Sequence, residues 1–93
     1  MGDAAACERT AELLRVLGQA TRLKILEQLR DGSRCAGGFC PECGEQSNVS
    51  RHLSVLKRAG LVEERRIGTR HDYSVANPDV FVLIDRARKI SGR

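Results

Sequence analysis

Two adjoining stretches, SNVSRHLSVLKRAG at residues 47–60 and LVEERRIGTRHDYSV at residues 61–75, decide the fold of this 93-residue chain. The first has apolar residues at helical spacing. Its inner stripe consists of Val49, Leu53 and Leu56. Ser47 or Asn48 can cap the start of this helix, and Gly60 stands where a helix stops. In the second stretch the period becomes that of strands, so it predicts a two-stranded hairpin with a glycine turn.

Two helices are expected before these elements. The first should run from about Ala5 to Leu17, with Gly18 as its stop. The second lies in TRLKILEQLRDG, residues 21–32. Thr21 is the capping side chain near its start, and Gly32 closes its far end.

A last helix should begin at Pro78, because proline suits the first turn of a helix. Its apolar stripe is wider than one small core requires. The stripe comprises Val80, Phe81, Leu83, Ile84, Ala87 and Ile90. We expect the excess to form a dimer face, the alternative being that it covers the domain.

The composition favours a single domain over residues 1–93, mainly α with a small β-hairpin. A chain of this length that is 41% hydrophobic can bury one core. With few aromatic residues, that core must use Leu, Ile, Val and Ala, as packed helices do. The order helix, helix, short turn, polar-faced helix, basic hairpin, helix is a winged helix-turn-helix layout.

The chain has no apolar run of membrane-spanning length and no basic segment followed by an apolar stretch at its start. We therefore expect a cytoplasmic protein without a membrane anchor. In that reducing compartment, four cysteines are metal ligands or redox-active thiols more often than structural disulfides.

The positive charge is concentrated in the second half. Residues 1–50 hold six Lys/Arg against seven Asp/Glu, whereas residues 51–93 hold ten against five. A basic half of this kind suits the phosphate backbone of double-stranded DNA, although a charged surface can also be merely solvated.

A helix that reads a duplex needs short hydrogen-bonding side chains near its start and cations further along. The helix at residues 47–60 supplies both, and arginines flank the glycine turn of the hairpin, where they can reach a phosphate strand or a minor groove. The candidate DNA-binding residues are Ser47, Asn48, Ser50, Arg51, His52, Ser54, Arg58, Arg65, Arg66 and Arg70.

The segments at residues 17–32 and 47–79 resemble the ArsR/SmtB family of metal-responsive winged-helix repressors. The resemblance rests above all on VSRHLSVLKRAGLV followed by RxGxRxxYSV. It implies a homodimer paired through the first and last helices. It also implies that this dimer binds a near-palindromic operator and is released by a thiophilic metal or metalloid.

The cysteines are candidate ligands for such an ion. CPECG at residues 40–44 places Cys40 and Cys43 at a spacing that can grip one soft ion, and a Gly-Gly joint lets Cys35 join them. Three thiolates suit arsenite or antimonite. Four, with Cys7, suit zinc, cadmium or lead, but Cys7 can equally be a small buried hydrophobe.

The sequence departs from the family pattern at two places. RCAGGFCPEC replaces the usual ELCVCDL-type segment, so only Cys35 matches the familiar ligand position. The family's second site, built from Asp and His on the last helix, is not expected because Asp79 is followed by no histidine.

Between residues 33 and 44 the helical pattern fails, and at best a short turn of helix is expected near Cys40. The glycines and Pro41 give this segment little intrinsic order. An ion could therefore order the segment locally while moving the helix that follows it.

Three alternatives remain open from the residues, and one of them is a winged helix that binds a protein partner and not DNA. Cys40 and Cys43 can form a reversible disulfide, which would make the protein a redox sensor. Zinc can instead be a permanent structural ion. A CxxC oxidoreductase places its cysteines after a buried strand, and no strand is expected before Cys40. Because no phosphate loop or catalytic triad is present either, we do not expect an enzyme.

Overall fold

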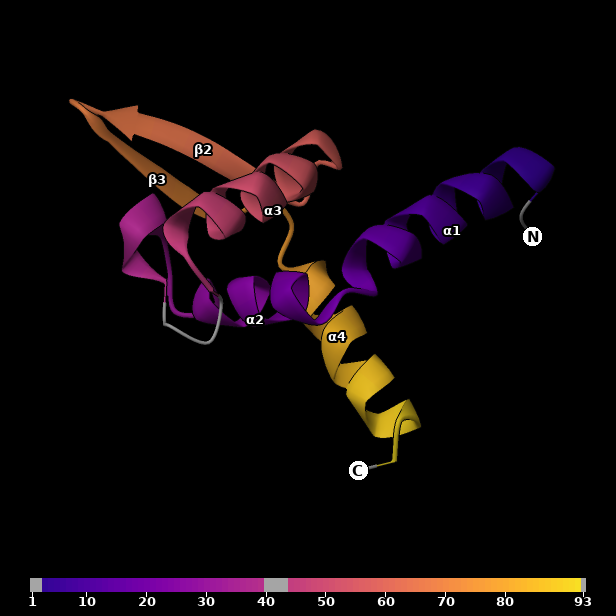
Figure 1. Ribbon diagram of the computed structural model, residues 1–93. Helices are drawn as coiled ribbons and strands as arrows, with labels where there is room; N and C mark the ends of the chain where they lie inside the picture. Colours follow the sequence, from indigo (N-terminus) through magenta and orange to yellow (C-terminus); the bar gives the residue numbers. More distant parts are fainter. Residues whose placement is uncertain (1–2, 40–43, 93) are drawn as a thin grey trace.

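The computed structural model describes residues 3–39 and 44–92, and it confirms a mainly helical winged helix-turn-helix fold (Figure 1). The elements follow one another as α1 (Ala4–Leu17), α2 (Ala20–Gln28), β1 (Arg34–Cys35), the 3-10 helix η1 (Ala36–Gly38), α3 (Gln46–Arg58), β2 (Val62–Ile67), β3 (Arg70–Val75) and α4 (Asp79–Ile90). Cys40 and Cys43 lie outside the described residues.

The core lies where α2 packs against α3, with α4 and the start of β2 closing it. Ile25, Leu26, Leu53 and Leu56 have no exposed surface at all. Val49, at the start of the predicted α3 stripe, is also buried. The helical spacing of these residues therefore brings one face of each helix into a shared apolar interior.

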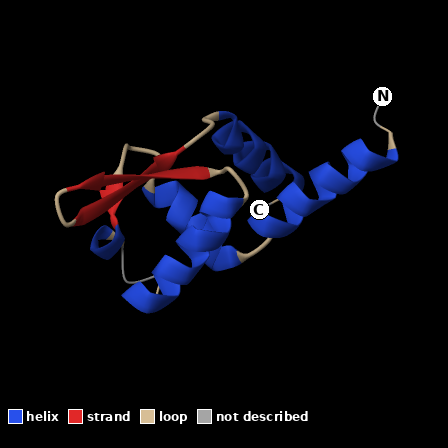
Figure 2. Ribbon diagram, turned by 90° about the horizontal axis from the view of Figure 1, so that it is seen from above, coloured by secondary structure: helices blue, strands red, loops and turns tan. Residues whose placement is uncertain are grey.

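The sheet has three antiparallel strands in the order β1, β3, β2. The hairpin pairs from Val62 opposite Val75 to Ile67 opposite Arg70, so residues 68 and 69 form the turn, and Gly68 has a positive φ of 63°. In Figure 2 the strands form a layer to one side of the helices.

The sequence did not predict β1. It is only two residues long, and its pairing partners are Tyr73 and Asp72 on β3. The expectation of no strand before Cys40 was therefore wrong. The short turn of helix expected near Cys40 lies outside the described residues, and the 3-10 helix η1 precedes it. Both β1 residues are half-buried, so this strand is not the buried strand that precedes a catalytic CxxC pair.

Two of the expected helix caps were also wrong. α3 already begins at Gln46, with Glu45 as a cap residue that makes no side-chain hydrogen bond. α2 begins at Ala20, because Gln19 accepts a hydrogen bond from the backbone of Arg22 and replaces the expected Thr21 cap. The stops at Gly18 and Gly60 are confirmed, Gly60 with a φ of 79°.

α1 and α4 project from the rest of the chain (Figure 1). Leu14 on α1 is 50% exposed, and Val82 and Ile90 on α4 are 58% and 86% exposed. An apolar cleft lies between these two helices and α2, lined by Leu14, Leu17, Gly18, Leu23, Leu83, Ile84, Ala87, Arg88 and Ser91.

Ion pairs and one cation–π contact attach α4 to α2. Arg30 donates hydrogen bonds to Glu27 and to Asp85 of α4, and Arg88 of α4 donates to Glu27 at 3.0 Å. The Arg30 guanidinium also lies 4.6 Å from the centre of the Phe81 ring. Exposed ion pairs contribute little singly, but this shared network fixes the direction of α4.

None of the described helices is long and apolar enough to cross a membrane.

Truncation of the core should destabilise the fold strongly. We expect Ile25→Ala to lower the free energy of unfolding by about 2–5 kcal/mol, because it leaves a cavity between α2 and α3. Ile67→Ala is the matched control, since Ile67 is 49% exposed, and it should cost less than about 1 kcal/mol. Urea denaturation at one protein concentration measures both, and equal losses would contradict the assignment of the core.

Candidate nucleic-acid interface

The outward face of α3 carries most of the predicted DNA-binding residues. Because Val49, Leu53 and Leu56 point into the core, the side chains on the opposite side of the helix face solvent. The exposed candidates on this helix are Ser47, Ser50, Arg51, Ser54 and Arg58. Hydroxyls lie toward its start and cations further along, which is the arrangement expected of a helix that reads base edges and holds phosphates.

Asn48 and His52, the other candidates on α3, are half-buried. A Cβ added to Gly44 would lie 3.2 Å from the amide nitrogen of Asn48, so the Asn48 side chain packs against the turn before the helix. The Nδ1 atom of His52 accepts a hydrogen bond from Arg22. Val55 is half-buried against the core and so does not belong to the outward face.

The hairpin arginines are all exposed, but they differ in their partners. Arg70 forms an ion pair with Asp72 at 3.0 Å. Arg66 lies with its Nη2 atom 3.4 Å from His71 Nε2. For Arg65, the described part of the chain contains no ion-pair partner, so its charge is available to a ligand. The hairpin extends beyond the helices on the side where α3 begins (Figure 1).

Glu64 attaches the hairpin to the end of α3. Its carboxylate accepts a hydrogen bond from Lys57 of α3 at 2.7 Å and also pairs with Nδ1 of His71 on β3. The hydrogen bonds from Lys57 and His71 lower the pKa of Glu64 to about 2. Burial, together with the negative charge of Glu64, raises the pKa of Tyr73, which lies directly across the strands from it.

Cys35 lies at the edge of this sheet, directly before η1. Its thiol is half-buried, and a Cβ added to Gly38 would lie 3.4 Å from the sulfur. The neighbouring Arg34 side chain donates hydrogen bonds to the carbonyl oxygens of Gln28, at 2.6 Å, and Gly38, at 3.0 Å. This segment is therefore tied to the end of α2 and to β3.

Cys7 lies in the first turns of α1 and is exposed. The start of α1 and the segment at residues 34–39 lie at opposite ends of the molecule in both ribbon views (Figures 1 and 2). A site that used both Cys7 and Cys35 would thus require two copies of the chain.

The described residues contain no group of three or more Cys, His, Asp or Glu side chains that could hold a metal ion. The donor chemistry still selects between ions, since thiolates suit soft metals and metalloids. On α4 the potential ligands are Asp79 and Asp85, without a histidine, which does not fit the Asp and His set of the family's second site.

The residues whose side-chain hydrogen bonds connect separate elements were not predicted from the sequence. Arg22 of α2 contacts His52 of α3, 30 residues along the chain, whereas Arg34 and Glu64 connect separate elements through contacts four to seven residues apart. No local spacing signals such contacts, although a charged residue beside an apolar helix stripe is a weak hint.

Comparison with known proteins identifies the family. A family model described as "Bacterial regulatory protein, arsR family" matches residues 19–64. The uncharacterized HTH-type transcriptional regulator Rv0081 of Mycobacterium tuberculosis is 41% identical over 85 residues, which cover 89% of this chain and 75% of that protein. The chain belongs to the ArsR family. It is therefore a transcriptional regulator and not an enzyme.

Solved structures of ArsR-family and similar proteins share the fold. The crystal structure of M. tuberculosis Rv0081 has a TM-score of 0.84 at 37% identity, covering 99% of this chain and 93% of that one. The solution structure of the homodimeric winged helix-turn-helix DNA-binding domain of Mb0332 from Mycobacterium bovis has a TM-score of 0.81 at 33% identity, covering 98% and 87%.

A further ArsR-type relative bears a name that states a role. The probable mercury resistance operon repressor of Streptomyces lividans is 39% identical over 82 residues, which cover 87% of this chain and 66% of that protein.

The Glu64 pairing should make the fold acid-sensitive. The pKa of Glu64 is lowered from 4.5 to about 2 in the folded state. Its contribution to the free energy of unfolding is therefore fully present above pH 4.5 and is lost as the pH falls toward 2. Glu64→Gln should flatten the decline of unfolding free energy over this range, measured by urea denaturation at several pH values. Glu63→Gln removes the same charge from the adjacent exposed position and should retain the wild-type decline; equal profiles for all three proteins would contradict the pairing.

Proposed function

We propose that this ArsR-family chain is a DNA-binding transcriptional repressor that acts as a homodimer and leaves its operator when its cysteines bind a thiophilic metal or metalloid. The observation that carries the proposal is the exposed face of α3, polar and cationic, beside a hairpin whose arginines are exposed. Both α3 and the hairpin pack on the same hydrophobic core.

Dimer formation is supported by the apolar surface of α1 and α4. Leu14, Val82 and Ile90 are large apolar side chains that a single copy of the chain leaves exposed. The apolar cleft between α1, α2 and α4 adds to this surface. A second copy related by a two-fold axis would cover this surface with the same residues. It would also place two α3 helices on one duplex, with half-sites one helical turn of about 34–36 Å apart, or a multiple of it.

We propose that Cys35, Cys40 and Cys43 bind the inducing ion. Arsenite or antimonite would be held by these three thiolates. Cys35 lies eleven residues before the start of α3 and is paired to the hairpin through β1. An ion held by these thiols would act on both DNA-binding elements. Zinc, cadmium or lead would need a fourth ligand, for which Cys7 of a second copy is the candidate.

DNA affinity should depend on exposed arginines of both elements. With a duplex that the protein selects from a random-sequence library, Arg51→Ala and Arg65→Ala should each weaken binding of the dimer by roughly 10- to 100-fold at ~0.1 M salt, because one phosphate contact is lost in each subunit. The slope of log affinity against log salt should become shallower by about two for each variant, one for each subunit of the dimer. Arg86→Ala on α4 is the control with the same charge change; because Arg86 shares a helix face with Val82 and Ile90, gel filtration must first show that this variant is still a dimer. A similar loss of affinity in that dimer would argue against a defined interface.

Release should require the thiol cluster. We expect arsenite or cadmium to lower the affinity of the wild-type protein for the selected duplex by about 5- to 150-fold, the usual range of allosteric coupling. Serine in place of Cys35, Cys40 or Cys43 should abolish this response while leaving DNA binding without inducer unchanged. Fluorescence anisotropy measures both quantities.

The same titration separates the alternatives. Release by peroxide or polysulfide, but not by metal, would identify a thiol redox sensor that uses Cys40 and Cys43. Unfolding on chelation would identify a structural zinc ion. The Cys7→Ser variant decides whether Cys7 is a ligand, since loss of the cadmium response with retention of the arsenite response requires a fourth thiolate.

A further inference from the structure

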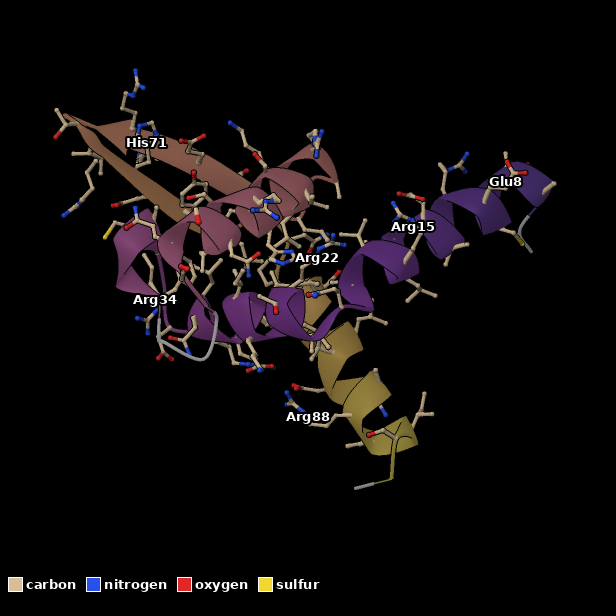
Figure 3. The ribbon with its side chains drawn as sticks, in the orientation of Figure 1. Glu8, Arg15, Arg22, Arg34, His71 and Arg88 are labelled. Atoms are coloured by element: carbon tan, nitrogen blue, oxygen red, sulfur yellow. The ribbon has the colours of Figure 1, made fainter. Side chains whose placement is uncertain are left out.

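The side chain of Arg22 connects three helices. Arg22 lies at the start of α2 and is half-buried. Its Nη1 atom donates to the carbonyl oxygen of Val16 in the last turn of α1, at 3.1 Å, and its Nε atom donates to Nδ1 of His52 on α3, at 3.2 Å. Figure 3 shows Arg22 where the end of α1 approaches α2 and α3.

This geometry determines the protonation of the His52 ring. An arginine side chain can only donate hydrogen bonds, so Nδ1 of His52 must be the acceptor. A ring that accepts at Nδ1 is neutral and carries its single proton on Nε2. Protonation of Nδ1 would replace the acceptor with a donor and would place a positive charge beside the Arg22 guanidinium.

The environment keeps the ring neutral. Burial, followed by the positive charges of Arg22 on α2 and Arg51 on α3, lowers the pKa of His52 from its ordinary value of 6.5. The remaining contact of this junction is with the Val16 carbonyl oxygen of α1, which carries no net charge. The two charges that act on the ring are thus both cationic, and both oppose its protonation.

We propose that Arg22 and His52 are positioning residues for operator recognition, linking the reading helix α3 to the end of the dimer helix α1. The inference rests on the proposed function, because it assigns roles to α1 and α3. The link sets the position of Ser50 and Arg51 relative to the dimer axis. It opens when His52 is protonated, so acid weakens operator binding.

The sequence suggested that His52 contacts DNA, whereas a positioning role makes different predictions. A residue that holds a phosphate changes the salt dependence of binding when it is replaced, but a positioning residue does not. Replacement by asparagine is also informative, because its side-chain oxygen can accept from Arg22 in place of Nδ1 and does not titrate.

The test compares wild type, His52→Asn, His52→Phe and Arg22→Met on the selected duplex at pH 7.5 and 5.5. At pH 7.5 we expect His52→Asn to bind like wild type, and His52→Phe and Arg22→Met to bind roughly fivefold more weakly, the effect of one lost hydrogen bond. At pH 5.5 wild type should bind more weakly than His52→Asn, in proportion to the fraction of His52 that NMR shows to be protonated and by at most roughly fivefold. Every protein in the comparison retains His71, so this second histidine does not distinguish them.

A second measurement does not depend on DNA. Nitrogen-15 NMR of the histidine rings should show the proton of His52 on Nε2 at pH 7.5 in wild type, and a mixture of tautomers in Arg22→Met. Circular dichroism at each pH verifies that the variants are folded. If Arg22→Met does not fold, the His52 variants and the wild-type NMR spectrum still decide the outcome.

Several results would overturn the inference. They are equal affinities of wild type and His52→Asn at a pH where the NMR spectrum shows His52 protonated, a proton on Nδ1 of His52 in the wild-type spectrum at pH 7.5, or a salt slope made shallower by about two in His52→Phe, which would place the ring of each subunit on a phosphate. Failure of wild type to retain any duplex would overturn the proposed function itself, and the inference with it. Normal wild-type binding with unaltered variants would overturn the inference alone.

Discussion

Burial of one face of α3 against α2 determines what this protein can present to a ligand. Leu53 and Leu56 meet Ile25 and Leu26 without leaving any of these side chains exposed. A helix anchored in this way cannot rotate without exposing leucine to water, at a cost of about 1.5–3 kcal/mol for each side chain. The polar face of α3 is therefore held outward by the core, and the arginine-bearing hairpin is held beside it by Lys57 and Glu64.

Much of this arrangement could be predicted from the sequence because its causes are local. The α3 stripe, the strand period that follows it and the stops at Gly18 and Gly60 depend on neighbours a few residues away, and the structure confirms them. β1 was missed because two residues carry no period of their own and become a strand only by pairing with Asp72 and Tyr73 on β3.

The candidate site was predictable in its residue types but not in its internal connections. Exposed serines and arginines on α3 follow from helical geometry once the core face is known. The half-buried state of His52 does not, since it depends on Arg22 in another helix. The thiol segment was expected to have little order, yet Arg34 ties its described part to the end of α2 and to η1. Such connections depend on tertiary packing, which spacing along the chain does not record.

The strand order leaves β2 at an edge of the sheet, with β3 between it and the short β1. Exposed edge strands can pair with strands of other molecules and so begin aggregation. Here β2 carries Glu63, Glu64, Arg65 and Arg66 in succession. Two strands of this composition brought together would have to desolvate charges on both faces. The residues that make the hairpin attractive to a polyanion thus also protect the protein against self-association through its sheet.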